Sequence, residues 1–135
     1  MPEILPPFTA ESARAKVKQM EALWNTCNPD RVAAEFTEDT RWRNRVDAME
    51  GHEQVLVFLR RKWIREQEYR LRMELWCWGS DRIAVSFRYE WHDREGQWFR
   101  SYGTELWEFA ADGLIKRRVA SINDLGIDIG DRQII

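Results

Sequence analysis

The first regular pattern of apolar residues in the chain has the period of an α-helix. Five apolar residues recur at spacings of four, three, four and three positions: Ala13, Val17, Met20, Trp24 and Cys27. This spacing puts them on one side of a helix, and Thr9 can cap its N-terminus, so an amphipathic helix of about 18 residues is expected. Residues 1–8 contain three prolines and are expected to form a loose N-terminal arm.

Two further segments predict helices. In NPDRVAAEF, Asn28 can act as a cap, and Pro29 stands at the first helical position, where its missing N–H costs nothing. HEQVLVFLRRKWIREQE, at 52–68, has an apolar stripe among charged residues, formed by Val55, Leu59 and Trp63.

Beyond residue 68 the apolar period changes to two, which is typical of β-strands. YRLRMELWC and RIAVSFRYEWH alternate apolar and polar residues, with Cys77 on the apolar side of the first. Longer strands are expected over 98–109 and 114–123, and the turn sequences GSD, DREG and ADG separate the four. The order of elements predicts one α+β domain over residues 1–135, helices first and then a curved antiparallel meander.

The stretch TRWRNR, at 40–45, predicts an earlier strand from about Asp39 to Val46. Its alternation gives one face to three arginines (Arg41, Arg43 and Arg45) and the other to Trp42 and Asn44. Outward-facing arginines would lie on a solvated or interface surface. With the opposite facing, an arginine would bind an acidic ligand.

Charge and composition exclude several classes of protein. The chain has 21 basic and 23 acidic residues with interspersed signs, which argues against a nucleic-acid partner. No stretch approaches the roughly 20 apolar residues of a membrane span, and the N-terminus does not have the pattern of a targeting signal. We therefore expect a cytoplasmic protein without a membrane partner.

Residues that bind metals or form disulfides are sparse. Cys27 and Cys77 lack CxxC spacing and are expected to be buried or half-buried thiols in a reducing compartment. His52 and His92 have no companion ligands at metal spacing, so no metal site is expected. No glycine-rich phosphate loop or nucleophile–base motif is present either, and no cofactor is expected.

Five motifs together resemble the nuclear transport factor 2-like superfamily. They are RWRNR (41–45), FLRRKWIREQEYRLRMELW (58–76), RIAVSFRYEWHD (82–93), RSYGTELWEF (100–109) and RRVASIND (117–124). The most similar members are the SnoaL-like proteins, and within them a branch described only as a domain of unknown function. GTE at 103–105 is a small departure, because that branch reads Gly-Asn-Glu there.

The resemblance implies a cone-shaped roll, in which three helices pack on a strongly curved, mainly antiparallel sheet with a cavity at the wide end. It also implies a homodimer through the sheet, and the mixed apolar, aromatic and charged outer residues of 82–92 and 98–109 favour the same arrangement. It does not imply one activity, because isomerases, dehydratases, epoxide hydrolases, polyketide cyclases and transport factors share the fold.

The resemblance also assigns candidate site residues. The general base of ketosteroid isomerase matches Asn44, which cannot abstract a proton, so that reaction is not expected here. This match places Asn44 and Trp42 inward and the arginines of TRWRNR outward. The isomerase's protonated, oxyanion-stabilising acid matches Glu105, whereas its partner tyrosine is matched by Met20.

Glu105 is therefore the candidate catalytic acid or base. On a mostly apolar strand face, desolvation would raise the pKa of its carboxyl group toward neutrality. Two alternatives remain open: Glu105 pairs with Arg118 across the hairpin, or a bulge brings it to the surface.

Eight tryptophans are many for this length, and the inward-facing aromatic residues form either core or the wall of a cavity. The predicted pocket comprises Trp24, Trp42, Asn44, Tyr89, Trp91, Ser101, Trp107 and Arg118. The sequence thus predicts a pocket for a small hydrophobic molecule, with acid–base chemistry of an isomerase, cyclase, dehydratase or hydrolase kind. A non-catalytic module that binds a small ligand or a peptide, or a dimeric scaffold, are the alternatives.

Overall fold

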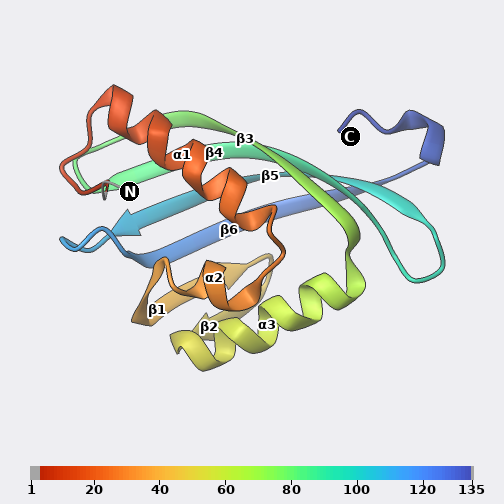
Figure 1. Cartoon of the computed structure of the whole chain (residues 1–135), viewed down its shortest axis with the longest axis horizontal. Coiled ribbons are helices and arrows are strands. Elements are labelled where there is room, and N and C mark those ends of the chain that lie inside the picture. Colours follow the sequence, from red (N-terminus) through yellow and green to blue (C-terminus); the bar gives the residue numbers. More distant parts are fainter. Residues whose placement is uncertain (1–3, 135) are drawn as a thin grey trace.

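The computed structural model describes residues 4–134, which form three α-helices, a six-stranded sheet and a short 3-10 turn. The helices are α1 (Ala10–Trp24), α2 (Pro29–Ala33) and α3 (Gly51–Arg65). The strands are β1 (Phe36–Asn44), β2 (Asp47–Glu50), β3 (Gln67–Trp78), β4 (Arg82–His92), β5 (Trp98–Phe109) and β6 (Ile115–Ile127). The 3-10 turn, η1, spans Ile129–Asp131 (Figure 1).

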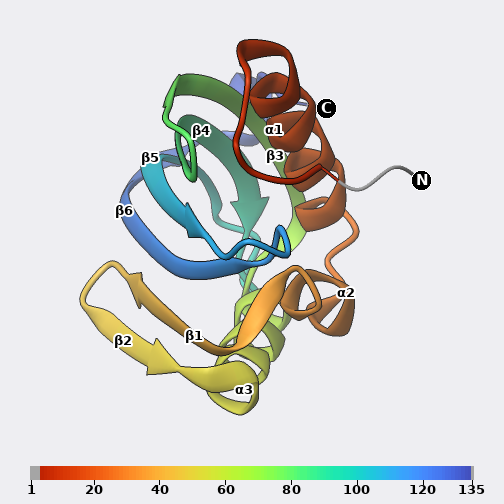
Figure 2. The same ribbon diagram turned by 90° about the vertical axis from the view of Figure 1, so that its left-hand side faces the viewer.

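The strands are arranged in the order β2-β1-β6-β5-β4-β3. β1 pairs with β6 in parallel, and the other four pairs are antiparallel. The long strands β3 to β6 curve around α1, and the β1–β2 hairpin lies beside α3 (Figures 1 and 2). The predicted architecture, three helices packed on a strongly curved and mainly antiparallel sheet, is confirmed.

The helices begin where local chemistry favours a start. The side chain of Thr9 accepts a hydrogen bond from the Ser12 N–H, and the Ser12 side chain accepts one from the Thr9 N–H, which completes a capping box on α1. Asn28 caps α2 by accepting from the N–H of Arg31. Gly51 opens α3 with a φ of 84°, which a glycine adopts without strain.

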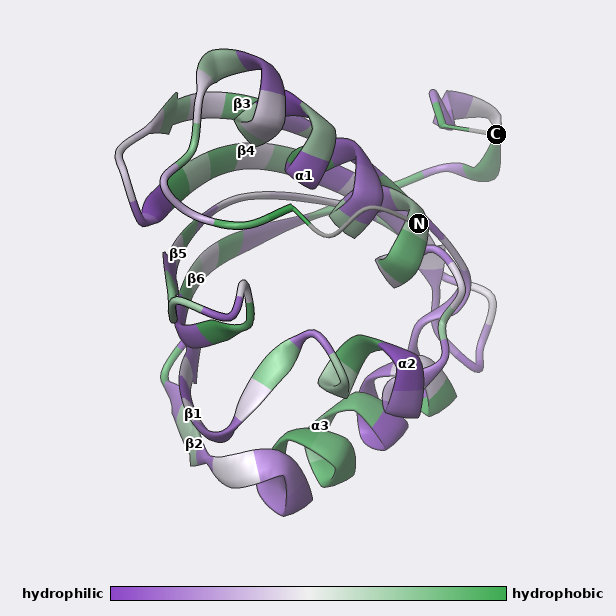
Figure 3. Cartoon of the chain, turned by 60° about the vertical axis from the view of Figure 1, so that its left-hand side comes forward, coloured by the Kyte–Doolittle hydropathy of each residue, from purple (hydrophilic) through white to green (hydrophobic). Residues whose placement is uncertain are grey.

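Hydrophobic and hydrophilic residues alternate along the strands, and the inner faces form the core (Figure 3). The buried inner residues of β4 are Ile83, Val85, Phe87, Tyr89 and Trp91. On β5, Gly103 stands opposite Phe87, where any side chain would collide with the Phe87 ring and the carbonyl oxygen of Ser121. This close approach explains why β5 has a glycine at that position.

Residues 4–8 do not form the loose arm that the sequence predicts. Phe8 is 4% exposed, and its ring packs edge-on against Phe109 with a centroid separation of 4.7 Å. The N–H of Phe8 donates to the carbonyl oxygen of Ser80 over 3.0 Å. Burial of an aromatic ring therefore fixes this segment against the sheet. The rest of the predicted arm, residues 1–3, lies outside the described residues.

The strand of TRWRNR ends earlier than predicted. Trp42 and Asn44 are buried and Arg41 and Arg43 are exposed, as expected. Arg45, however, adopts a φ of 58° in the turn that leads to β2, a strand that the sequence analysis does not predict. Because the turn breaks the alternation, Arg45 leaves the outer face and is half-buried.

A β-bulge near the end of β3 changes which face of the sheet its last side chains lie on. The pairing with β4 shifts register between Leu75 and Cys77, which leaves Trp76 as the extra residue. Cys77 then stands opposite Ala84 and is exposed, so its prediction on the buried face is wrong. Cys27 is half-buried, as predicted.

Candidate functional site

A cavity of about 740 Å³ lies between α3, the β1–β2 hairpin and β4. Met49, Val57 and Phe58 give it an apolar wall, and most of the other lining side chains are polar or charged. This volume falls within the range of roughly 300–1,000 Å³ that is usual for small-molecule sites.

Lys62 and Glu66 form an ion pair on the cavity wall, one helical turn apart at the end of α3. Nζ of Lys62 donates to Oε1 of Glu66 over 2.7 Å, and each side chain is 8% exposed. The ammonium group lies 4.9 Å and 4.4 Å from the ring centroids of Tyr69 and Tyr89. Burial acts to lower the pKa of Lys62, but the Glu66 carboxylate and Tyr89 raise it above its ordinary value. Lys62 is therefore a cation at neutral pH.

Glu66 has one oxygen available to a ligand. Its Oε1 is bound to Lys62, whereas Oε2 accepts no hydrogen bond from residues 4–134 and is not sealed from solvent. Because Glu66 lines the cavity, we expect this oxygen to be the carboxylate acceptor for a bound molecule.

Arg45 lies at the turn beside the cavity and is held by a chain of hydrogen bonds. Its Nη2 donates to Oδ1 of Asp124 over 2.8 Å, and Asp124 also accepts from Oγ of Ser101 over 2.5 Å. Ser101 accepts in turn from Nε1 of Trp91 over 3.0 Å. Burial acts to raise the pKa of Asp124, but hydrogen bonds from Arg45 and Ser101 and the charges of Arg45 and Arg65 hold it below its ordinary value.

Glu105 and Arg118 form a bidentate ion pair behind the cavity. Nε and Nη2 of Arg118 donate to Oε1 and Oε2 of Glu105 over 2.8 and 2.9 Å, and Nε1 of Trp107 donates to Oε1 over 2.8 Å. The guanidinium lies between two indoles, 4.9 Å from the Trp24 ring and 4.5 Å from the Trp42 ring. The Arg118 pairing that the sequence leaves open for Glu105 is therefore present.

The third donor of Arg118 determines how Asn44 faces the cavity. Nη1 of Arg118 donates to Oδ1 of Asn44 over 3.2 Å. A guanidinium can only donate, so the oxygen of the Asn44 amide must face Arg118. The NH₂ group of Asn44 is then directed away from the ion pair, and Asn44 lines the cavity.

The structure brings together only part of the predicted pocket. Asn44 and Tyr89 line the cavity. Glu105 and six of the predicted pocket residues are buried and do not line it: Trp24, Trp42, Trp91, Ser101, Trp107 and Arg118. They form the packed wall behind Asn44 and the hydrogen-bond chain to Arg45. The role of Glu105 as an acid or base stays a prediction.

Lys62 and Glu66 are functional candidates that the sequence does not predict, and Arg45 is one of three arginines for which the sequence leaves binding of an acidic ligand open. The spacing of Lys62 and Glu66 in RKWIRE is a signal for an i,i+4 pair, but it gives no sign that the pair is buried. The inward turn of Arg45 depends on a positive φ that has no clear signature in the sequence.

The described part of the chain has neither a cluster of metal ligands nor a membrane-spanning helix. Among residues 4–134, no three His, Cys, Asp or Glu side chains gather closely enough to hold a metal ion. None of the helices in that range combines the length and the apolar character required to cross a bilayer.

Solved structures with the same fold belong to the nuclear transport factor 2-like, SnoaL-like class. SalBIII, an epoxide hydrolase/cyclase-like enzyme with a role in pyran ring formation in the polyether salinomycin, is 16% identical, with 84% of this chain and 93% of that chain covered and a TM-score of 0.73. A hexachlorocyclohexane dehydrochlorinase, LinA type 2, is 15% identical, with 89% and 90% covered and a TM-score of 0.70. A ketosteroid isomerase-like protein from Catenulispora acidiphila, in complex with trimethylamine, is 18% identical, with 77% and 82% covered and a TM-score of 0.68.

The chain belongs to the family described as "Protein of unknown function (DUF1348)", whose model matches residues 6–135. No curated protein matches the chain. At identities below 20%, the solved structures establish the fold alone.

Proposed function

We propose that the protein binds a small organic molecule in the cavity beside α3 and transfers a proton on it. The observation that carries this proposal is the Glu66 carboxylate, which lines the cavity with one oxygen held by Lys62 and the other without a hydrogen-bond partner among residues 4–134. A positioned carboxylate of this kind is a general base that is ready to accept a proton from a bound molecule.

Two neutral groups at the cavity wall can donate hydrogen bonds to a carbonyl oxygen of the bound molecule. The Asn44 amide is oriented by Arg118 so that its NH₂ group can donate, and Tyr89 adds a hydroxyl group at the cavity wall. Donors aimed at a carbonyl oxygen stabilise the negative charge that develops when a proton leaves the neighbouring carbon. The residues therefore suit proton abstraction next to a carbonyl group.

Glu105 has a positioning role in this proposal. Its two oxygens accept three N–H hydrogen bonds from Arg118 and Trp107, an arrangement that fits a fixed carboxylate. The carboxylate holds Arg118, and Arg118 holds Asn44. The fold shared with an epoxide hydrolase/cyclase-like enzyme and a dehydrochlorinase supports acid–base chemistry of this kind.

The test is hydrogen–deuterium exchange at the α-carbon of a panel of small ketones and aldehydes, followed by NMR in deuterated water. We expect enzyme-dependent exchange, and a loss of about 10²- to 10⁴-fold in the Glu66→Gln variant, which keeps the shape of the side chain but cannot accept the proton. Glu53→Gln, a change to another cavity carboxylate that is exposed, is the matched control and should exchange normally. Normal exchange by Glu66→Gln would contradict the proposal.

A non-catalytic binding module is the second candidate, and one observation favours it. Both candidate acid–base carboxylates, Glu66 and Glu105, are engaged by a cation. In that case ligands would raise the melting temperature of the wild type and of Glu66→Gln equally, and neither protein would catalyse exchange.

We also infer a homodimer through the outer face of the sheet. Four residues form a row across four neighbouring strands on that face: Cys77, Ala84, Leu106 and Val119. They border a hollow of about 400 Å³, and Leu106 is 54% exposed. Exposed apolar rows of this kind favour contact with a partner surface.

A further inference from the structure

We propose that the molecule bound in the cavity is an organic acid, and that Arg61 and Arg65 bind its carboxylate. This inference names the substrate class of the site described above and therefore rests on the proposed function. It starts from the charges on the cavity wall.

Four cations line the cavity, and two of them are already neutralised. Lys62 is paired with Glu66 and Arg45 with Asp124. Arg61 and Arg65 are exposed and have no carboxylate within 4 Å among residues 4–134. Their charge is therefore available to a ligand.

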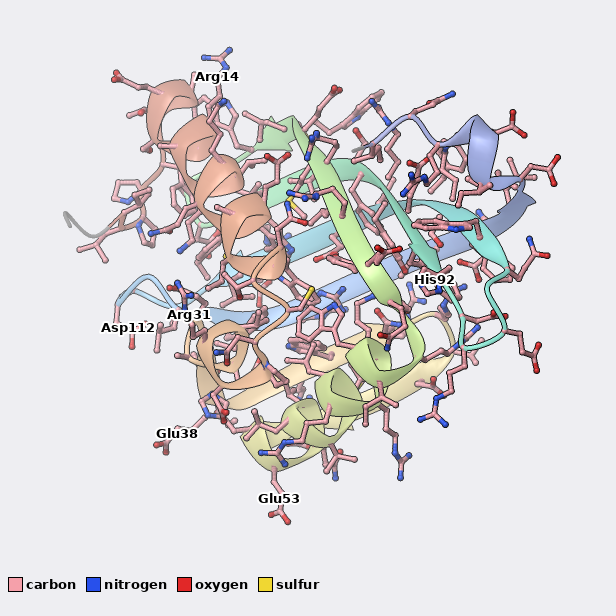
Figure 4. All side chains as sticks on the ribbon, turned by 45° about the vertical axis from the view of Figure 1, so that its right-hand side comes forward. Arg14, Arg31, Glu38, Glu53, His92 and Asp112 are labelled. Carbon is pink, nitrogen blue, oxygen red and sulfur yellow. The ribbon has the colours of Figure 1, made fainter. Side chains whose placement is uncertain are left out.

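Of the three acidic residues that line the cavity, Glu66 is paired with Lys62, and Glu53 stands at the opposite end of α3. Glu53 is eight residues before Arg61 and twelve before Arg65, which corresponds to about 12 and 18 Å along a helix. Its side chain projects away from the molecule at the start of α3 (Figure 4). Asp47, on β2, is exposed as well. The cavity is thus basic at the C-terminal end of α3, where an anion would be attracted.

Arg61 and Arg65 are placed to act together. They are four residues apart on α3, so their side chains leave the same face at a Cβ separation of roughly 5–6 Å. The guanidinium of Arg65 lies 5.2 Å from the ring centroid of Trp91, a contact that positions the group without using its N–H donors. Two guanidinium groups in this arrangement can each donate to one carboxylate.

Local charge around Arg65 also favours an anion. The Asp124 carboxylate accepts hydrogen bonds from Arg45 and Ser101, and the charge of Arg65 also acts on it. One negative charge therefore stands beside two positive ones. The apolar wall of Met49, Val57 and Phe58 then accommodates the rest of the molecule, which fits a carboxylic acid with an apolar body.

The experiment compares 3-phenylpropionate with its neutral amide, 3-phenylpropanamide, by tryptophan fluorescence titration. We expect saturable binding of the acid in the millimolar range or tighter, at least about tenfold stronger than that of the amide, because charge-assisted hydrogen bonds are about twice as strong as neutral ones. The advantage should shrink at high salt. The double variant Arg61→Gln/Arg65→Gln should lose the preference for the acid, and each single variant should lose part of it.

Arg60→Gln is the matched control, because Arg60 is an exposed arginine of the same helix that does not line the cavity. The proposal is overturned if the acid does not bind, if it binds no better than the amide, or if Arg60→Gln weakens it as much as the Arg61 and Arg65 changes do. Failure of the proposed function gives a different result: Glu66→Gln and the wild type then behave alike in proton exchange, whatever the preference for the acid.

Discussion

The guanidinium of Arg118 donates from Nη1 to Oδ1 of Asn44 over 3.2 Å, while its other two nitrogens, Nε and Nη2, donate to Glu105. Through this contact, the buried ion pair fixes the orientation of the Asn44 amide. The carboxylate fixes the guanidinium, and the guanidinium decides that the amide presents NH₂ rather than oxygen to the cavity. Asn44 is thereby a hydrogen-bond donor of fixed direction, which is the property that a site for a developing oxyanion requires.

Replacement of Asn44 by aspartate tests this orientation. The Asn44→Asp side chain can still accept from Arg118, but it offers no donor to a bound carbonyl oxygen. We expect the rate of α-carbon exchange to fall about 10²- to 10³-fold, the loss that follows removal of one oxyanion donor.

The melting temperature serves as the control for Asn44→Asp, because the Arg118 contact is kept and the fold should remain stable. Undiminished exchange in this variant would show that the Asn44 amide does not contact the substrate. Asn44→Ala, which removes both groups, should lose exchange and also some stability.

The Glu105–Arg118 pair should behave as a buried pair in unfolding experiments. The two residues are 4% and 2% exposed, so removal of one partner leaves the other polar group without compensation. We expect Arg118→Met to lower the free energy of unfolding by about 3–5 kcal/mol in urea titrations. The double variant Glu105→Leu/Arg118→Met should recover part of that loss.

Arg43→Met is the matched control for this cycle, because Arg43 is an exposed arginine of β1. It should change the free energy of unfolding by less than about 1 kcal/mol. A small effect of Arg118→Met, similar to that of Arg43→Met, would mean that water or another residue replaces the lost partner.

Much of the fold could be predicted because the periodicity of the chain is unusually regular. The change from helical spacing to alternation at residue 68 marks where α3 gives way to β3, and the alternation correctly places Asn44 and Tyr89 on inner faces. The Arg118 pairing of Glu105 is one of the alternatives that the sequence leaves open, since a hairpin through ADG brings the two strands into register.

The cavity could not be derived in the same way. Periodicity assigns a side chain to a face but does not say whether that face meets another element, so most inward aromatic residues proved to be core. The backbone conformation of one residue also shapes the site. Arg45 has a positive φ, and in this conformation its side chain reaches Asp124. The basic end of the cavity arises from the orientation of α3, which is a property of tertiary packing.

The C-terminal segment should detach from the sheet in acid. Glu90 is buried on the outer face, where its carboxylate accepts from Arg100 over 2.8 Å and from the N–H groups of Gln133 and Ile134. Burial acts to raise the pKa of Glu90, but the Ile134 and Gln133 N–H groups and Arg100 lower it below its ordinary value of 4.5. Since the folded state has the lower pKa, this stabilisation is complete above 4.5 and is lost as the pH falls through the folded value.

Amide hydrogen exchange measures this directly. We expect protection of the Gln133 and Ile134 N–H groups at neutral pH and a loss of it on acidification, after correction for the intrinsic pH dependence of exchange. Glu90→Gln should lack the protection at every pH, whereas Glu74→Gln, an exposed glutamate of β3, should behave as wild type. Protection that persists in Glu90→Gln would assign the docking of the segment to other contacts, such as that of Arg132 with the ring of Trp98.

The outer row of apolar residues predicts a dimer that one substitution should dissociate. Leu106 lies in the centre of the row between Ala84 and Val119, and it is 54% exposed in one chain, so Leu106→Asp should cost the monomer little stability. A buried, unpaired carboxylate in a self-complementary interface should nevertheless prevent association. Light scattering coupled to size-exclusion chromatography should give a dimer mass for the wild type and a monomer mass for Leu106→Asp. Val46→Asp, the same change at a 93% exposed position in the β1–β2 turn, should remain dimeric. A monomer mass for the wild type would contradict the proposed dimer.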